Sequence, residues 1–334
     1  MGLKRIATID LPSGGDYNHA SLHASSGRVH LADTALDQIE VLDGPGASHL
    51  GTIPECAGKS GVLAVGEAVV AAARGSGELL VPDGATAQLL RRFRVGPAPN
   101  GLAWDPDHAR LLVADTSEYS ARLVDLEGLA LAAVALPGRS RWAVHDAPLS
   151  RFYVNVKDPA SVVALAAANL ATVGWFSPEA VDPHGLGLDT ERDLPLVACD
   201  DASLRWVDPQ SGQELHDVAL GGEPDVVLVD SRRALGYVSV GDPPALHIVD
   251  LDERAIREAI ITGADCTPAT DAVSYPYVLP TGTSPPVATA LFSAASGTGM
   301  GDQTVTPSFS LDVPANAAAG AYLATWTFSL VSGP

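Results

Sequence analysis

The sequence predicts an all-β protein, a β-propeller of four-stranded blades, and three observations support this prediction. A block of about 40 residues recurs six times between His19 and Thr262. Within each block, short apolar runs alternate with turns rich in Asp, Pro and Gly, which is the pattern of antiparallel strands joined by tight loops. Helical repeats of similar length would need apolar residues at i, i+3, i+4 and i+7, and such short runs do not supply them.

The block at residues 99–136 shows the pattern most clearly, with strands expected at 101–104, 110–114, 121–126 and 129–136. The ends of the third strands define the period, because successive ends are spaced by 40, 42, 41, 42 and 42 residues. These ends are Asp43, Asp83, Asp125, Ala166, Asp208 and Asp250. Four strands in a period of this length are typical of a propeller blade.

The six blocks are flanked by sequence that departs from the pattern. Residues 4–11 (KRIATIDL) resemble a fourth strand without its own first three, as in propellers whose last blade is completed by the N-terminal strand. The matching strands of a seventh blade would start near Gly263, where the pattern stops, so that blade is incomplete. We expect a propeller over residues 1–263, a linker at 264–286 and a β-rich tail resembling part of a sandwich at 287–334. Alternatively, the tail supplies strands that close the ring.

Composition limits the partners. The formal net charge of −20 and the absence of Lys/Arg clusters argue against nucleic acid, because binding to phosphates needs such clusters. No apolar run is long enough to span a membrane, and no apolar stretch follows Lys4 and Arg5 as in a signal peptide. These features predict a soluble, cytoplasmic protein, although the tail hints at an exported or surface relative. The three cysteines lack the spacing of a disulfide framework or zinc site.

Polar residues recur just before each expected first strand. In a propeller, the loops that enter the innermost strands meet at one mouth of the central channel, so we expect these residues to converge. They are His19, Lys59 or Ser60, Asn100, Arg141, His184 and Asp225. A second set of polar residues recurs where each second strand ends. It comprises Asp33, Arg74, Asp115, Asn155, Asp200 and Asp242, and turn chemistry explains most of its aspartates.

The first set of residues predicts a binding site at the channel mouth. Imidazole and carboxylate groups suit a divalent metal ion, for which we single out His19, His184 and Asp225. Arg141 offers a bidentate fork to an anion, and Asn100 adds an amide. The alternative is that these polar groups only solvate loops and cap strand ends. No catalytic triad, nucleophile elbow or metalloprotease motif is present.

The blades resemble the YVTN-type propellers, relatives of the seven-bladed lactonase-like and quinohaemoprotein-like rings. The resemblance covers about residues 3–265. It rests on the motifs PNGLAWDP (99–106), LLVADT (111–116), RWAVHD (141–146), FYVNVKDP (152–159), PHGLGLD (183–189), PDVV (224–227) and YVSVGDP (237–243). Related lactonases bind a divalent cation through Glu, Asn and Asp at the channel mouth. The resemblance implies such roles for Asn100 and Asp225, with histidine in place of the glutamate.

Two main hypotheses for function follow. The first is a non-catalytic propeller that binds a small polar ligand or a protein partner at the channel mouth. The second is a metal-dependent lactonase or hydrolase that uses His19, Asn100, His184 and Asp225 around a divalent cation. A third is a bacterial surface-adhesion module that depends on the tail, because residues 313–334 resemble the end of a bacterial surface-type β-sandwich.

Overall fold

The fold is known from a computed structural model, which describes residues 3, 6–12, 15–58, 61–177, 182–241 and 244–261. By its contacts the chain divides into two units after Ile261, and every described strand lies in the first. The predicted linker and tail, at 264–286 and 287–334, lie outside the described residues. So do Cys266 and all the residues on which the resemblance to a sandwich rests.

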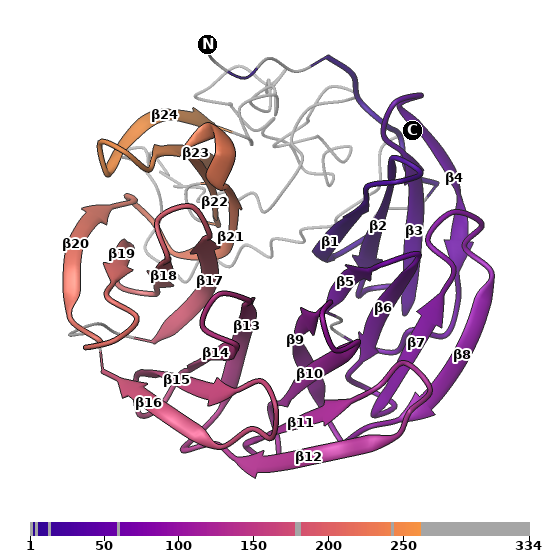
Figure 1. Cartoon of the computed structure of the whole chain (residues 1–334). Coiled ribbons are helices and arrows are strands. Elements are labelled where there is room, and N and C mark those ends of the chain that lie inside the picture. Colours follow the sequence, from indigo (N-terminus) through magenta and orange to yellow (C-terminus); the bar gives the residue numbers. More distant parts are fainter. Residues whose placement is uncertain are drawn as a thin grey trace, which may run out of the picture. The chain divides into compact units, whose positions relative to one another are not determined.

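The first unit contains six four-stranded antiparallel sheets, which are the six predicted blades. In each sheet the strands follow in chain order, and Figure 1 shows the sheets arranged around a common centre, with the first strand of each innermost. Blades 1–3 consist of β1 (Tyr17–His23), β2 (Arg28–Asp33), β3 (Gln38–Asp43), β4 (Ser48–Ile53), β5 (Val62–Val65), β6 (Ala68–Ala73), β7 (Glu78–Pro82), β8 (Leu89–Arg94), β9 (Pro99–Asp105), β10 (Arg110–Asp115), β11 (Ser120–Val124) and β12 (Ala130–Ala135).

Blades 4–6 repeat this arrangement, with one short 3₁₀ helix, η1 (Ser231–Arg233), between the first two strands of blade 6. Their strands are β13 (Ser140–Asp146), β14 (Arg151–Val156), β15 (Ser161–Ala166), β16 (Thr172–Phe176), β17 (Pro183–Asp189), β18 (Leu194–Cys199), β19 (Ser203–Val207), β20 (Glu214–Ala219), β21 (Pro224–Asp230), β22 (Leu235–Val240), β23 (Ala245–Asp250) and β24 (Ala255–Ile261). No helix in the described part of the chain is long and apolar enough to cross a membrane.

The apolar core lies between neighbouring blades. Five clusters of buried residues fill the five interfaces between consecutive blades from blade 1 to blade 6. Alternate side chains of a strand point to opposite faces of its sheet. Phe152 accordingly packs toward blade 3, whereas Tyr153 packs toward blade 5. Because both faces of the middle strands are covered, these strands appear in the sequence as continuous apolar runs.

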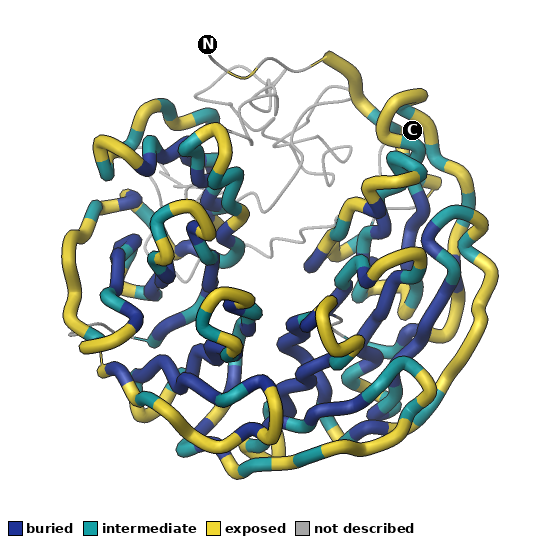
Figure 2. Tube along the Cα trace, viewed as in Figure 1, coloured by how far each residue is buried: buried dark blue, intermediate teal, exposed yellow. Residues whose placement is uncertain are grey.

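Burial is highest along the middle strands of the blades and falls toward the rim. Figure 2 shows buried residues along the middle strands and exposed ones along the outer strands, such as β8 and β12. The two described cysteines, Cys56 and Cys199, are both buried. Burial raises the pKa of the Cys199 thiol to about 12, so this thiol stays protonated and inert at neutral pH.

The segment before blade 1 differs from the sequence prediction. A strand was expected at residues 4–11, but none of residues 6–12 is in a strand, and Ile6 is almost fully exposed. A strand forms only against a neighbouring strand. The neighbours predicted for this segment would come from residues after 262, which are outside the described part of the chain.

Candidate functional site

A polar pocket lies where the inner strands of the six blades come together. It has a volume of about 180 Å³, and every blade contributes to its lining. The nine lining residues are Asn18 and His19 of blade 1, Arg74 of blade 2, Asn100 of blade 3, Arg139, Arg141 and Trp142 of blade 4, His184 of blade 5 and Asp225 of blade 6. The structure thus brings together His19, Asn100, Arg141, His184 and Asp225, which are the five predicted channel-mouth residues that it describes.

The lining residues that lie on inner strands face the pocket because β1, β9, β13, β17 and β21 carry β-bulges. In β13, Ser140 pairs with Val156 and Ala143 pairs with Val154, so Arg141 and Trp142 together oppose one residue of β14. The same shift occurs near the start of β1, β17 and β21. A bulge bends the strand and re-aims the extra side chain. The predicted residues consequently lie inside the inner strands rather than just before them.

The bulge also corrects the register of blade 1. The pair Tyr17 and Asp33 in blade 1 is equivalent to the pair Ser140 and Val156 in blade 4. The residue after Tyr17 is Asn18, so Asn18, and not His19, is the counterpart of Arg141. Sequence reasoning missed Asn18. It could have been found by counting from the second strand, because Asn18 lies 15 residues before Asp33 (33 − 18), as Arg141 does before Val156 (156 − 141).

His19 occupies the position equivalent to Trp142, and the two rings contact each other across the pocket lining with centroids 4.5 Å apart. His19 is buried, and this burial is the main reason why its pKa falls to about 4. The positive charges of Arg74 and His184 lower this pKa further, whereas Asp225 opposes the shift. His19 is therefore neutral at pH 7.

Three guanidinium groups line the pocket. Arg74 Nη2 donates a hydrogen bond to Asn100 Oδ1, and Arg141 Nη1 lies 3.3 Å from His184 Nε2. The Nε atoms of Arg74 and Arg141 are buried and have no hydrogen-bond partner among the described residues. Burial lowers the pKa of both arginines, and the nearby charge of Arg139 adds to that effect.

His184 is held by two carboxylates. Its Nδ1 lies 3.0 Å from Asp200 Oδ1, and its Nε2 lies 3.1 Å from Asp225 Oδ1. Asn155 Nδ2 donates to the backbone oxygens of His184 and Gly185 and thereby fixes β17 against β14. Burial alone would raise the pKa of Asp225, but the hydrogen bond and positive charge of His184 lower it overall. Asp225 is accordingly a carboxylate at neutral pH.

The second set of predicted residues divides into two groups. Asp33 and Asp115 accept hydrogen bonds from the backbone N–H groups two and three residues further on, as expected of turn chemistry. Arg74, Asn155 and Asp200 instead line the pocket or support His184. Asp242 of this set, and Lys59 and Ser60 of the first set, lie outside the described residues.

The metal prediction concerned His19, His184 and Asp225. All three line the pocket. Within the described parts of residues 3–261, no group of three or more His, Cys, Asp or Glu side chains is arranged to hold a metal ion. Both nitrogens of His184 already face carboxylates, which leaves neither of them directed at a vacant ligand position. Metal binding by these residues stays a prediction.

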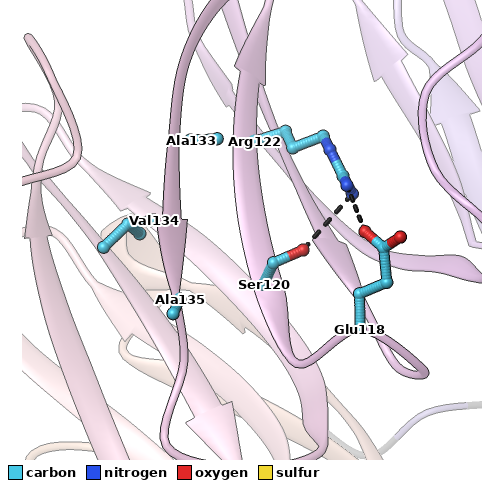
Figure 3. Close-up of a pocket in the computed structure, with 6 residues that line it drawn as sticks. All are labelled: Glu118, Ser120, Arg122, Ala133, Val134 and Ala135. Atoms are coloured by element: carbon cyan, nitrogen blue, oxygen red, sulfur yellow. Dashed lines mark hydrogen bonds and ion pairs between the residues drawn. The ribbon is translucent and has the colours of Figure 1, made fainter.

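A second hollow lies on blade 3, away from the inner strands. It is open, has a volume of about 450 Å³ and is lined by β11, by β12 and by Glu118 in the turn before β11. Figure 3 shows that Arg122 turns toward Glu118, with which it forms an ion pair, and toward Ser120. The remaining lining is Ala133, Val134 and Ala135. Since its one guanidinium is already paired, this hollow offers less to a polar ligand than the pocket between the blades.

Comparison with known proteins does not assign the chain to a family. No protein-family model matches the sequence, and a search of curated proteins gave no match. The relation to YVTN-type propellers and a seven-blade count therefore stay predictions, while the six-bladed, four-stranded architecture is established by the sheets themselves.

Proposed function

We propose that this propeller binds a small polar molecule in the pocket between its inner strands. The observation that carries the proposal is the convergence of nine residues from all six blades on one partly enclosed space. Binding sites are typically concave and carry a few convergent polar groups. Here the lining includes three arginines, two histidines, two asparagines and one aspartate.

The size of the pocket favours a small molecule over a protein segment. Its volume of about 180 Å³ is below the roughly 300–1,000 Å³ typical of sites for drug-sized ligands. Its rigidity also supports binding, because the inner strands are fixed by antiparallel pairing and by interblade contacts such as those of Asn155. A preorganised site loses little entropy when it binds.

A screen by thermal shift tests the proposal. Small carboxylates, phosphates, amines, amino acids and polyols are added separately to the full chain, and the melting temperature is followed with concentration. We expect at least one class to raise it, because a ligand that binds only the folded state stabilises that state. If no class does so, the proposal is overturned.

A matched pair of variants locates the binding. Asn18→Phe places a ring in the pocket and should abolish the shift caused by any active compound. Ser48→Phe makes the same type of change at an exposed position on the outer strand β4 and should preserve the shift. A compound that still stabilises Asn18→Phe as strongly as the wild type binds elsewhere, which would also contradict the proposal.

A further inference from the structure

The charge of the pocket is opposite to that of the whole chain. The protein has 40 acidic and 20 basic residues, a formal net charge of −20. The pocket lining has three arginines and one aspartate, which gives +3 − 1 = +2 before its two histidines are counted. Three like charges brought together in a partly buried space repel one another. Such an arrangement is stabilised when an anion occupies the centre.

The arginines of this pocket have no carboxylate partner, in contrast to several other arginines in the described part of the chain. Arg91, Arg122, Arg192, Arg205 and Arg233 each form an ion pair with a carboxylate. Among the described residues, Arg74, Arg139 and Arg141 have no carboxylate within ion-pair distance. The carboxylate in the pocket, that of Asp225, lies 3.1 Å from His184 Nε2.

Several N–H donors of these guanidinium groups form no hydrogen bond with the described residues. Each arginine carries five N–H donors in a planar fork. Arg74 uses one of them on Asn100, and among the described residues the guanidinium of Arg141 has a single hydrogen-bond partner, His184. Both Nε–H groups are buried without a partner in the described part of the protein, which is costly unless a ligand accepts from them.

We propose that the ligand of this pocket is a small oxyanion, in which a carboxylate or phosphate group binds Arg74 and Arg141, with Arg139 adding positive charge. The inference rests on the proposed function of the pocket and specifies its ligand class. Arginine forks match the spacing of oxygens in both groups and bind them bidentately. Asn18 and Asn100 supply amides for the rest of the ligand, and Trp142 supplies an apolar wall.

Calorimetry with four probes tests the ligand class on the full chain at low ionic strength. The probes are succinate, inorganic phosphate, the neutral diamide succinamide and the diamine 1,4-diaminobutane. We expect succinate, phosphate or both to bind, and the two arms distinguish a carboxylate site from a phosphate site. Succinamide has nearly the shape of succinate without its charge, so it should bind far more weakly.

Variants then connect the binding to the arginines. Arg74→Gln and Arg141→Gln should each weaken anion binding roughly 10- to 100-fold, as expected for loss of charged hydrogen bonds. Arg233→Gln removes the same charge from an exposed ion pair on η1 and should leave affinity unchanged. If a Gln variant does not fold, Arg141→Lys serves instead: it keeps the charge, loses the fork and should bind with intermediate affinity.

The outcomes separate the ligand class from the proposed function. Succinamide or the diamine binding as tightly as succinate would overturn the oxyanion class while leaving a binding pocket in place. Anion binding that Arg233→Gln weakens as much as Arg74→Gln would also overturn it, because the effect would then come from overall charge. If none of the four probes binds, the oxyanion class is overturned, and the wider thermal-shift screen decides whether the pocket binds anything.

Discussion

Acidification from about pH 7 to about pH 4 is expected to destabilise the propeller by several kcal/mol, because two histidines are buried in their neutral form. Burial lowers the pKa of His19 and of His30 from 6.5 to about 4 in each case. The positive charges of His23 and Arg28 lower the pKa of His30 further. Neither ring nitrogen of His30 has a hydrogen-bond partner among the described residues.

The direction of the effect follows from proton binding. Between pH 6.5 and 4 the unfolded chain binds protons at these two positions, whereas the folded chain does not. The free energy of unfolding therefore falls as the pH decreases through this window, and the full stability is present above pH 6.5. Each histidine contributes about 3 kcal/mol to the loss when fully protonated in the unfolded state.

Urea denaturation at a series of pH values measures this loss. His30→Leu replaces the buried ring with an apolar side chain and should remove about half of the pH dependence. It should also preserve stability at pH 7, since it eliminates two unpartnered polar atoms. His216→Gln, at an exposed position on β20, is the control and should leave the pH dependence unchanged. Equal pH dependence in wild type and His30→Leu would contradict the prediction.

Gly101→Ala is expected to destabilise the propeller by about 3 kcal/mol, because it overpacks the contact between blades 3 and 4. A Cβ atom at Gly101 would lie 2.3 Å from the backbone oxygen of Arg141. That oxygen belongs to an inner strand and cannot move without shifting β13. Since Arg141 lines the pocket, the same shift should weaken binding of any ligand there.

Gly236→Ala provides the control for this variant. It makes the same chemical change on β22, where the nearest atom, Leu251 Cδ2, would be 3.4 Å from the new methyl group, an ordinary contact. We expect little change in its urea midpoint and a large decrease for Gly101→Ala. Equal midpoints for the two variants would show that the blades tolerate the methyl group and would refute the proposed packing.

Much of the fold could be predicted from the sequence because strands and turns are local patterns. Three of the predicted third-strand ends, Asp43, Ala166 and Asp250, are the last residues of β3, β15 and β23. The other three fall one residue beyond the observed strands. The first strand of blade 3 begins earlier than predicted: β9 starts at Pro99 rather than at residue 101, because the strand continues through its bulge.

The candidate site could be predicted only in part. The period of the repeat was sufficient to select Asn100, Arg141, His184 and Asp225, since equivalent positions of successive blades meet at the centre. Asn18, Arg139 and Trp142 were missed as site residues. Asn18 was missed because the bulge sets its register, and the other two because they flank a predicted residue rather than repeat with the period.

The sequence alone determined the blade repeat, since alternation of apolar strands with Asp-, Pro- and Gly-rich turns depends only on neighbouring residues. The tertiary structure decided which side chains face the pocket and how they are paired. It showed, for example, that Arg74 binds Asn100 from the neighbouring blade and that Asp200 fixes His184. Such contacts depend on bulges and on the distance between blades, which no local pattern encodes.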